Sequence, residues 1–225
     1  MTKSLEIAIF PSMTLPPNHS GLLIAFEGID GAGKTTQANR LQSYLNSKGI
    51  QVLLTKEPTN GKWGQVLRDS AVTGRLSLQE EVETFIKDRK EHVETKLLPA
   101  LEKGFVVIVD RYYFSTAAYQ GARGLDPAEL IEKNEFFAPE PDLLILLDVD
   151  TRIGLGRIKS RGDTANHFEK AETLDRAREI FLGLKKPYLL RLDANLPLEK
   201  ITELIISKIE MLLSKKDISG KVKSV

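Results

Sequence analysis

Five short runs of consecutive apolar residues divide the chain, and each is bounded by turn-forming or charged residues. They are Leu22–Phe26, Val52–Leu54, Phe105–Val109, Leu143–Leu147 and Tyr188–Leu192. Continuous apolar runs are typical of strands that are buried on both faces, as in a parallel sheet. Arg191 interrupts the fifth run, which therefore fits either a strand or the end of a helix.

Amphipathic helical patterns lie between these runs. Apolar residues recur at helical spacing from Lys34 to Leu45, before a stop at Lys48-Gly49. The same spacing predicts a helix from Leu78 to Leu101 and a last helix from Leu198 to Leu212. The alternation of strands and helices predicts an α/β fold of three layers, in which helices flank a five-stranded parallel sheet through right-handed crossovers.

The composition fits one compact globular domain. Of the 225 residues, 41% are hydrophobic and 28% are charged, and both fractions lie near the globular average. The net charge of +1 gives no electrostatic case for a nucleic-acid or membrane partner, and no apolar run approaches the roughly 20 residues of a membrane-spanning helix. The absence of cysteine excludes thiolate nucleophiles and zinc–thiolate sites, and it is compatible with a reducing cytoplasm. We expect an N-terminal extension over residues 1–20, a domain over 21–214 and a frayed tail over 215–225.

The segment GIDGAGKT at Gly28–Thr35 matches the phosphate-binding pattern G-x-x-x-x-G-K-[ST] at every fixed position. It directly follows the first predicted strand and begins the first helical pattern. Glycines let backbone N–H groups approach phosphate oxygens, and the helix N-terminus adds partial positive charge. We therefore expect Lys34 to reach the β- and γ-phosphates of a nucleoside triphosphate and Thr35 to be a magnesium ligand. The residues predicted to bind the triphosphate are Gly28, Ile29, Asp30, Gly31, Ala32, Gly33, Lys34, Thr35 and Thr36.

A phosphate-binding loop alone does not separate a kinase from a GTPase or a motor ATPase. The chain contains no N-K-x-D element for reading guanine, and its length leaves little room for motor machinery. A small kinase is therefore the leading class.

Charged residues at positions expected to be buried point to ligands. Asp110 and Arg111 follow the third apolar run, and the carboxyl ends of parallel strands face the ligand crevice. Asp110 is suited to hold Mg²⁺ directly or through water, and Arg111 to bind a second phosphate; a solvated ion pair is the alternative. Arg89 lies four residues after Phe85 on the apolar stripe of the predicted helix, so its charge should pair or bind something. Phe85 offers a ring for stacking a base, unless the helix rotates enough to let Arg89 reach solvent.

Two further sites carry charge near the predicted phosphates. Phosphates would repel the carboxylate of Asp30, so we expect it to point toward a sugar hydroxyl or a metal-bound water. Arg157 and Arg161 lie one turn apart before an irregular polar stretch. They suit a lid over about residues 157–170 that closes on the transferring phosphate, with a basic solvated helix face as the alternative.

These residues resemble the thymidylate kinase family of nucleoside monophosphate kinases. FEGIDGAGKTTQ at 26–37 is similar to the family's phosphate-binding loop, and EPT at 57–59 to its second-strand loop. FIKDRKEHVE at 85–94 is similar to its base-binding helix, and DRYYFSTAAYQGARGL at 110–125 to its signature segment. The likeness runs in order from about Leu22 to Leu213.

The resemblance implies a P-loop kinase fold like that of adenylate kinase, with ATP·Mg²⁺ as donor and dTMP as acceptor, giving dTDP and ADP. It implies that Phe85 stacks on thymine and that Arg89 hydrogen-bonds the base edge. Arg111 would hold the acceptor phosphate and Asp30 the deoxyribose 3′-hydroxyl. The other predicted substrate-binding residues are Glu57, Pro58, Thr116, Tyr119 and Gln120. The predicted catalytic residues are Lys34, Arg111, Arg157 and Arg161, the metal ligands are Thr35 and Asp110, and the family suggests a homodimer.

Gly31-Ala32 lacks the loop arginine of some members, which resembles the family arrangement in which lid arginines supply that charge. The chain departs from the family pattern at four other places, of which the first is the N-terminal extension over residues 1–20. Lys56 stands where many members have arginine, and lysine lacks the bidentate fork. Asn166-His167 replaces a common lid Asp-Arg pair, and Thr116 stands where asparagine is frequent.

Two alternative functions therefore stay open: a kinase for UMP or CMP, and a nucleotide-binding protein with a degenerate lid. His92 is expected to support Arg89 one turn away. Trp63 fits either a cover over the acceptor site or a packing residue.

Overall fold

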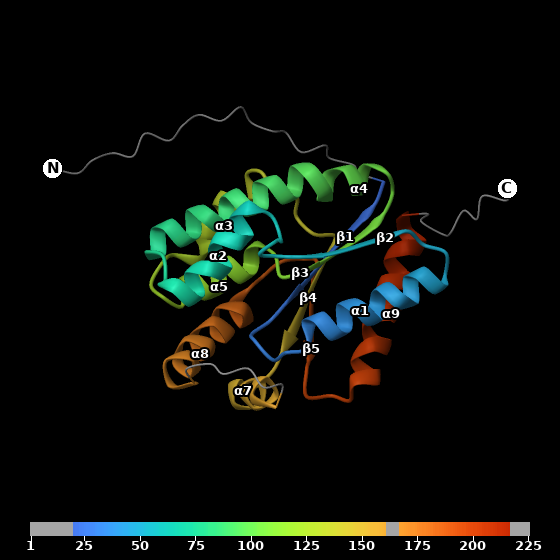
Figure 1. The fold of residues 1–225 in the computed structure, drawn as a ribbon. Coiled ribbons are helices and arrows are strands. Elements are labelled where there is room, and N and C mark those ends of the chain that lie inside the picture. Colours follow the sequence, from blue (N-terminus) through green and yellow to red (C-terminus); the bar gives the residue numbers. More distant parts are fainter. Residues whose placement is uncertain (1–19, 161–166, 217–225) are drawn as a thin grey trace.

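A parallel sheet of five strands forms the centre of the protein, and a computed structural model describes residues 20–160 and 167–216 (Figure 1). The strands are β1 (Leu22–Glu27), β2 (Val52–Lys56), β3 (Val106–Asp110), β4 (Leu143–Asp148) and β5 (Leu189–Asp193). They lie in the order β2-β3-β1-β4-β5, and each neighbouring pair is parallel. The predicted α/β class with a five-stranded parallel sheet is confirmed.

Helices cover both faces of this sheet. α1 (Lys34–Ser47) and α9 (Leu198–Lys216) pack together on one face, and α3 (Leu78–His92), α5 (Tyr113–Gly121) and α8 (His167–Gly183) lie on the other (Figure 1). The other described α-helices are α2 (Lys62–Thr73), α4 (Leu98–Glu102), α6 (Pro127–Glu135) and α7 (Thr151–Lys159). None of the helices in the described parts of the chain is long and apolar enough to cross a membrane.

The burial of the strands explains their sequences. β1 and β3 are buried at every residue and β4 at all but its last, because sheet neighbours flank them and helices cover both faces. β2 and β5 form the edges and are only partly buried. Arg191 fits on an edge strand, where its Nη2 lies 2.9 Å from Asp148 Oδ2, so the fifth apolar run is a strand and not the end of a helix.

The strands end at polar residues that the apolar runs did not include. Each strand runs one or two residues further toward its carboxyl end than predicted, to Glu27, Lys56, Asp110, Asp148 and Asp193. The sheet hydrogen bonds continue through these residues, because backbone pairing does not depend on side-chain polarity. The carboxyl edge of the sheet therefore carries acidic and basic side chains.

The segment 78–101 is not the single regular helix predicted from its apolar spacing. α3 ends at His92, a π-helical turn (η1) covers Val93–Leu97, and α4 follows. The N–H of Leu98 donates to Val93 O, an i→i−5 bond, and Pro99 supplies no N–H for the next one. The prediction missed the interruption because apolar residues continue at four-residue spacing through it, and Val93, Leu97 and Leu101 are all buried.

Candidate active site

The glycine-rich loop between β1 and α1 has the backbone geometry of an anion site. Gly28, Gly31 and Gly33 have φ angles of 137°, 80° and 95°, in the region that disfavours side chains. α1 begins at Lys34, and no side chain caps its first N–H groups. Those uncapped N–H groups, together with the helix dipole, favour a bound anion at this end of α1.

Lys34 is buried inside the loop. Its Nζ donates to Gly28 O at 3.0 Å and to Ile29 O at 2.9 Å. Burial, with a smaller contribution from the positive charge of Arg111, lowers the pKa of Lys34 to about 7. A polyphosphate in the loop would supply negative charge that favours the ammonium form.

Thr35 and Asp110 meet at the carboxyl ends of the central strands. The Thr35 hydroxyl donates to Asp110 Oδ2, and Asp110 is the last residue of β3. A hydroxyl and a carboxylate oxygen side by side, next to a phosphate-binding loop, are the hard oxygen donors that Mg²⁺ accepts. These two residues therefore fit the predicted metal-binding pair.

Arg111 lies beside the loop in a left-handed backbone conformation. It is the only non-glycine residue among those described with a positive φ, at 71°. Its Nη2 donates to Asp30 Oδ1 at 2.6 Å, and its guanidinium lies 5.3 Å from the centre of the Tyr119 ring. Tyr119 Oη donates to Asp30 Oδ2 and accepts from Asp30 N–H, both at 3.0 Å. Burial raises the pKa of Tyr119, so its hydroxyl stays protonated and can donate.

Asp30 and Arg111 line two adjoining cavities. One cavity contains the phosphate-binding loop and Asp110. The other is lined by the other residues predicted to bind the acceptor: Glu57, Pro58, Phe85, Arg89, Thr116, Tyr119 and Gln120. The structure therefore brings the predicted loop and acceptor residues, which lie far apart along the chain, to one continuous site.

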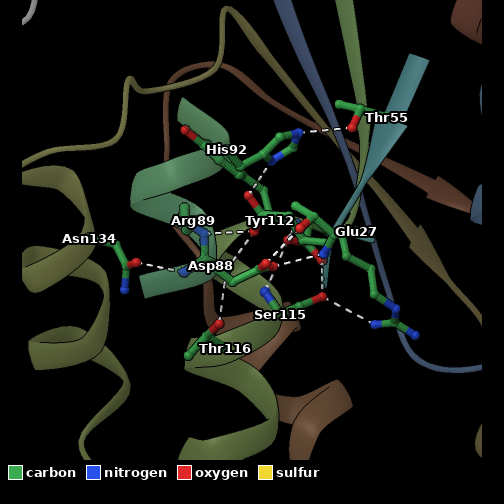
Figure 2. A network of polar contacts seen from close by, with 12 residues as sticks. Glu27, Thr55, Asp88, Arg89, His92, Tyr112, Ser115, Thr116 and Asn134 are labelled. Atoms are coloured by element: carbon green, nitrogen blue, oxygen red, sulfur yellow. Dashed lines mark hydrogen bonds and ion pairs between the residues drawn. The ribbon is translucent and has the colours of Figure 1, made fainter. Parts of the chain in front are cut away.

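Arg89 is held in place because it donates hydrogen bonds to side chains from three separate segments of the chain (Figure 2). Its side chain is 1% exposed. Nε donates to Glu57 Oε2 at 2.7 Å, Nη1 to Asn134 Oδ1 at 2.6 Å, and Nη2 to Thr116 Oγ1 at 3.1 Å. The expectation that this charge is paired is confirmed, and the alternative that Arg89 reaches solvent is wrong.

Helix α3 also anchors the loop after β2. Asp88 accepts from Thr59 N–H at 2.8 Å and from Thr59 Oγ1 at 2.6 Å. His92 Nδ1 lies 2.9 Å from Glu57 Oε1, and its Nε2 lies 2.8 Å from Thr55 Oγ1 (Figure 2). His92 was predicted to support Arg89, and it does so indirectly, because both side chains bind the Glu57 carboxylate.

Gln120 presents an unsatisfied acceptor at the acceptor cavity. It is 3% exposed, and its Oε1 has no hydrogen-bond partner among the described residues. A buried polar atom without a partner is costly, and a ligand that donates a hydrogen bond removes that cost.

Helix α7 packs directly on the phosphate-binding loop. Gly31 and Gly154 approach so closely that a Cβ on Gly31 would meet Gly154 O at 2.2 Å. Arg157, one turn further along α7, donates from Nη1 to Gly31 O at 3.3 Å and from Nη2 to Ala194 O at 3.0 Å. Arg157 is thus held at the loop, whereas Arg161 and Asn166 lie outside the described residues.

Comparisons with known proteins fit this site. A sequence model for thymidylate kinase matches residues 26–205. The chain belongs to the thymidylate kinase family.

Curated relatives that carry the name thymidylate kinase align over most of their length. The protein of Xanthomonas oryzae pv. oryzae (strain PXO99A) is 57% identical over 175 residues, which is 78% of this chain and 77% of the relative. That of Xanthomonas campestris pv. campestris (strain B100) is 55% identical over the same shares of both chains. That of Xylella fastidiosa (strain M23) is 52% identical over 80% of this chain and 83% of the relative.

Several residues at this thymidylate kinase site were not anticipated from the sequence. Arg68 lines the cavity of the phosphate-binding loop, and Arg75 lines the acceptor cavity. Asn134 accepts a hydrogen bond from Arg89, and Glu27 accepts one from Ser115 in the segment after Arg111. An acidic residue directly after a fully buried run was a signal for Glu27, because a buried carboxylate needs donors. Arg68 and Asn134 lie on ordinary amphipathic helices, and Arg75 lies in the connection between α2 and α3, so none of the three gives such a signal.

Trp63 is not among the residues that line the acceptor cavity. Its ring lies 4.7 Å from Lys62 Nζ and 5.0 Å from Lys87 Nζ. Trp63 was predicted either to cover the acceptor site or to be a packing residue. These contacts agree with packing between the side chains of α2 and α3 in this thymidylate kinase family member.

Proposed function

We propose that this chain transfers the γ-phosphoryl group of ATP directly to dTMP, giving dTDP and ADP. The observation that carries the proposal is that the phosphate-binding cavity and the acceptor cavity meet at Asp30 and Arg111. A donor phosphate in the loop and an acceptor phosphate at Arg111 would then face each other across a short gap. That arrangement suits direct in-line transfer, in which positioning and charge neutralisation do most of the work.

The proposed donor site is the loop Gly28–Thr36 with Lys34. Lys34 lies at the loop carbonyls and can reach phosphates that enter the same cavity. Thr35 and Asp110 would hold Mg²⁺, which supplies positive charge to the phosphate oxygens. Arg157 is proposed to add positive charge from α7, and Arg161 to do so from the lid.

The proposed acceptor site places each part of dTMP against a different group. Arg111 would hold the phosphate, and Asp30 would accept from the 3′-hydroxyl beside Tyr119. Arg89 uses three of its five N–H groups in the described hydrogen bonds, which leaves at most two for the base edge. Glu57 lines both cavities, and its two carboxylate oxygens are engaged by Arg89 and His92, so its proposed role at the acceptor is to orient Arg89.

Phe85 is the proposed stacking platform for the base. Phe85→Ala is expected to raise the KM for dTMP about tenfold, since stacking on an aromatic ring is worth roughly 1–3 kcal/mol per base. The KM for ATP should not change, because Phe85 lines only the acceptor cavity. Steady-state kinetics with each substrate varied in turn measure both values. Glu83→Ala, at an exposed position on the same helix, is the matched control, and equal increases in both KM values would contradict the stacking role.

A panel of acceptors tests the substrate itself. ADP release is measured with dTMP, dUMP, UMP and CMP at fixed ATP. We expect dTMP to give the highest kcat/KM, by about tenfold over dUMP, because a pocket that fits the 5-methyl group gains about that much. A higher kcat/KM for UMP or CMP would identify the alternative kinase, and no ADP above background with any acceptor would identify a nucleotide-binding protein.

Two coarser expectations accompany this function. The family likeness supports a homodimer, and the absence of cysteine supports a location in a reducing cytoplasm. Sedimentation of the purified chain measures whether it forms a homodimer.

A further inference from the structure

Glu27, the last residue of β1, lies buried beneath the segment that carries Arg111. Its relative exposure is 0%, and it lines none of the described cavities. Oε1 accepts from Tyr112 N–H at 2.8 Å and from Ser115 N–H at 3.0 Å, while Oε2 accepts from the Ser115 hydroxyl at 2.5 Å. Figure 2 shows the Glu27 carboxylate directed toward Ser115. Three donors thus converge on a carboxylate that cannot itself touch a ligand in these cavities.

The bond to Glu27 sets the direction of the Ser115 hydroxyl. A serine hydroxyl has one hydrogen to donate, and here Glu27 receives it. The lone pairs of Ser115 Oγ are then available to Arg111 Nη1, which lies 3.1 Å away. Without an acceptor at Glu27, the hydroxyl could turn its hydrogen toward the guanidinium, and the bond to Arg111 would be lost.

Glu27 also fixes the backbone directly after Arg111, at Tyr112. The left-handed φ of Arg111 is uncommon for a residue with a side chain, and it persists only where the surroundings hold it. Arg111 N–H donates to Phe26 O at 3.0 Å, and the next N–H, of Tyr112, donates to the Glu27 side chain. The last two residues of β1 therefore fix this turn through one backbone bond and one carboxylate.

We propose that Glu27 is a positioning residue that acts through Ser115 to aim the Arg111 guanidinium at the phosphate of the acceptor. The proposal rests on the proposed function in one respect, that the acceptor is a nucleoside monophosphate. Asp30 holds the other side of the same guanidinium, from the phosphate-binding loop. Arg111 is thereby held from β1 and from the loop before a substrate arrives, which lowers the cost of ordering it on binding.

Glu27→Gln tests the relay with two ligands that differ only in the phosphate. The amide keeps the shape of the side chain, but its NH₂ group faces the Ser115 hydroxyl in place of an acceptor oxygen. Isothermal titration calorimetry is expected to show dTMP binding weakened about tenfold, since hydrogen bonds to charged groups are worth that much. Thymidine binding should not change, because thymidine has no phosphate for Arg111.

Two further variants separate the relay from a general loosening of α5. Ser115→Ala keeps Glu27 on its two N–H donors but removes the link to Arg111, so it should also weaken dTMP and spare thymidine. In an Arg111→Lys background, Glu27→Gln should add little to the loss. Glu135→Gln is the matched control, because Glu135 accepts from Tyr113 on α5 at 3.1 Å but has no described bond to Ser115 or Arg111. It should leave binding of both ligands unchanged.

Equal weakening of dTMP and thymidine by Glu27→Gln would show a structural role only and overturn the proposal. Unchanged dTMP affinity in a folded Glu27→Gln protein would overturn it as well, and so would full additivity with Arg111→Lys. If Glu27→Gln fails to fold, Ser115→Ala decides alone, and unchanged dTMP affinity there rejects the relay. A wild-type protein that binds dTMP no better than thymidine would instead contradict the proposed function.

Discussion

Replacement of Lys34 by alanine is expected to lower kcat by about 10²–10³-fold, because it removes a preorganised positive charge from the developing charge of the transferring phosphate. Lys34 is buried among loop carbonyls, where water replaces its charge poorly. The lost stabilisation should therefore appear in kcat, measured as ADP release at saturating ATP and dTMP.

Lys48→Ala provides the control for this loss. Lys48 caps the carboxyl end of the same helix and lies over the Tyr44 ring, far along α1 from the loop. Its removal should leave kcat unchanged. A Lys34→Ala protein that keeps most of its turnover with normal ATP affinity would contradict the assignment of the phosphate-binding loop.

Arg89→Met is expected to lower the free energy of unfolding by about 3–5 kcal/mol, the usual cost of leaving one partner of a buried ion pair alone. Glu57 is 3% exposed at its side chain, and Arg89 is the permanently charged group among its described partners. Asn134 Oδ1 and Thr116 Oγ1 would lose the hydrogen bonds from Arg89 at the same time. Urea denaturation followed by circular dichroism measures the loss.

The double variant Arg89→Met/Glu57→Gln separates the charge from the packing. Removing the carboxylate as well eliminates the uncompensated charge, so this protein should regain part of the stability lost in Arg89→Met. Both proteins should bind dTMP weakly, since neither presents a guanidinium to the base. A double variant less stable than Arg89→Met would show that Glu57 contributes mainly through His92.

The sheet and the phosphate-binding loop were predictable because their signals are local in the sequence. Continuous apolar runs located all five strands, and GIDGAGKT located the loop together with Lys34 and Thr35. Asp110 and Arg111 followed from the rule that strand ends face the crevice. For the same reason, the burial of Arg89 could be predicted from helical spacing, and its need for a partner from the cost of burying a charge.

The identity of the partners could not be predicted from local patterns. Asn134 lies 45 residues from Arg89, and Glu27 lies 88 residues from Ser115, so only the folded sheet and helices bring these pairs together. The π turn after His92 was missed for a different reason. It changes the backbone hydrogen bonds without a clear change in the spacing of apolar side chains.

The close approach of Gly31 and Gly154 limits how this loop could be exchanged with that of another family member. A side chain at position 31 would collide with the backbone of α7, and one at position 154 would come within 2.7 Å of Asp30 O. A loop that carries arginine at position 31 could therefore be grafted only if α7 moved outward, and Arg157 would move with it. In this protein, arginine in the loop and arginine held at the loop by α7 compete for the same space, so a chimera can gain one only by displacing the other.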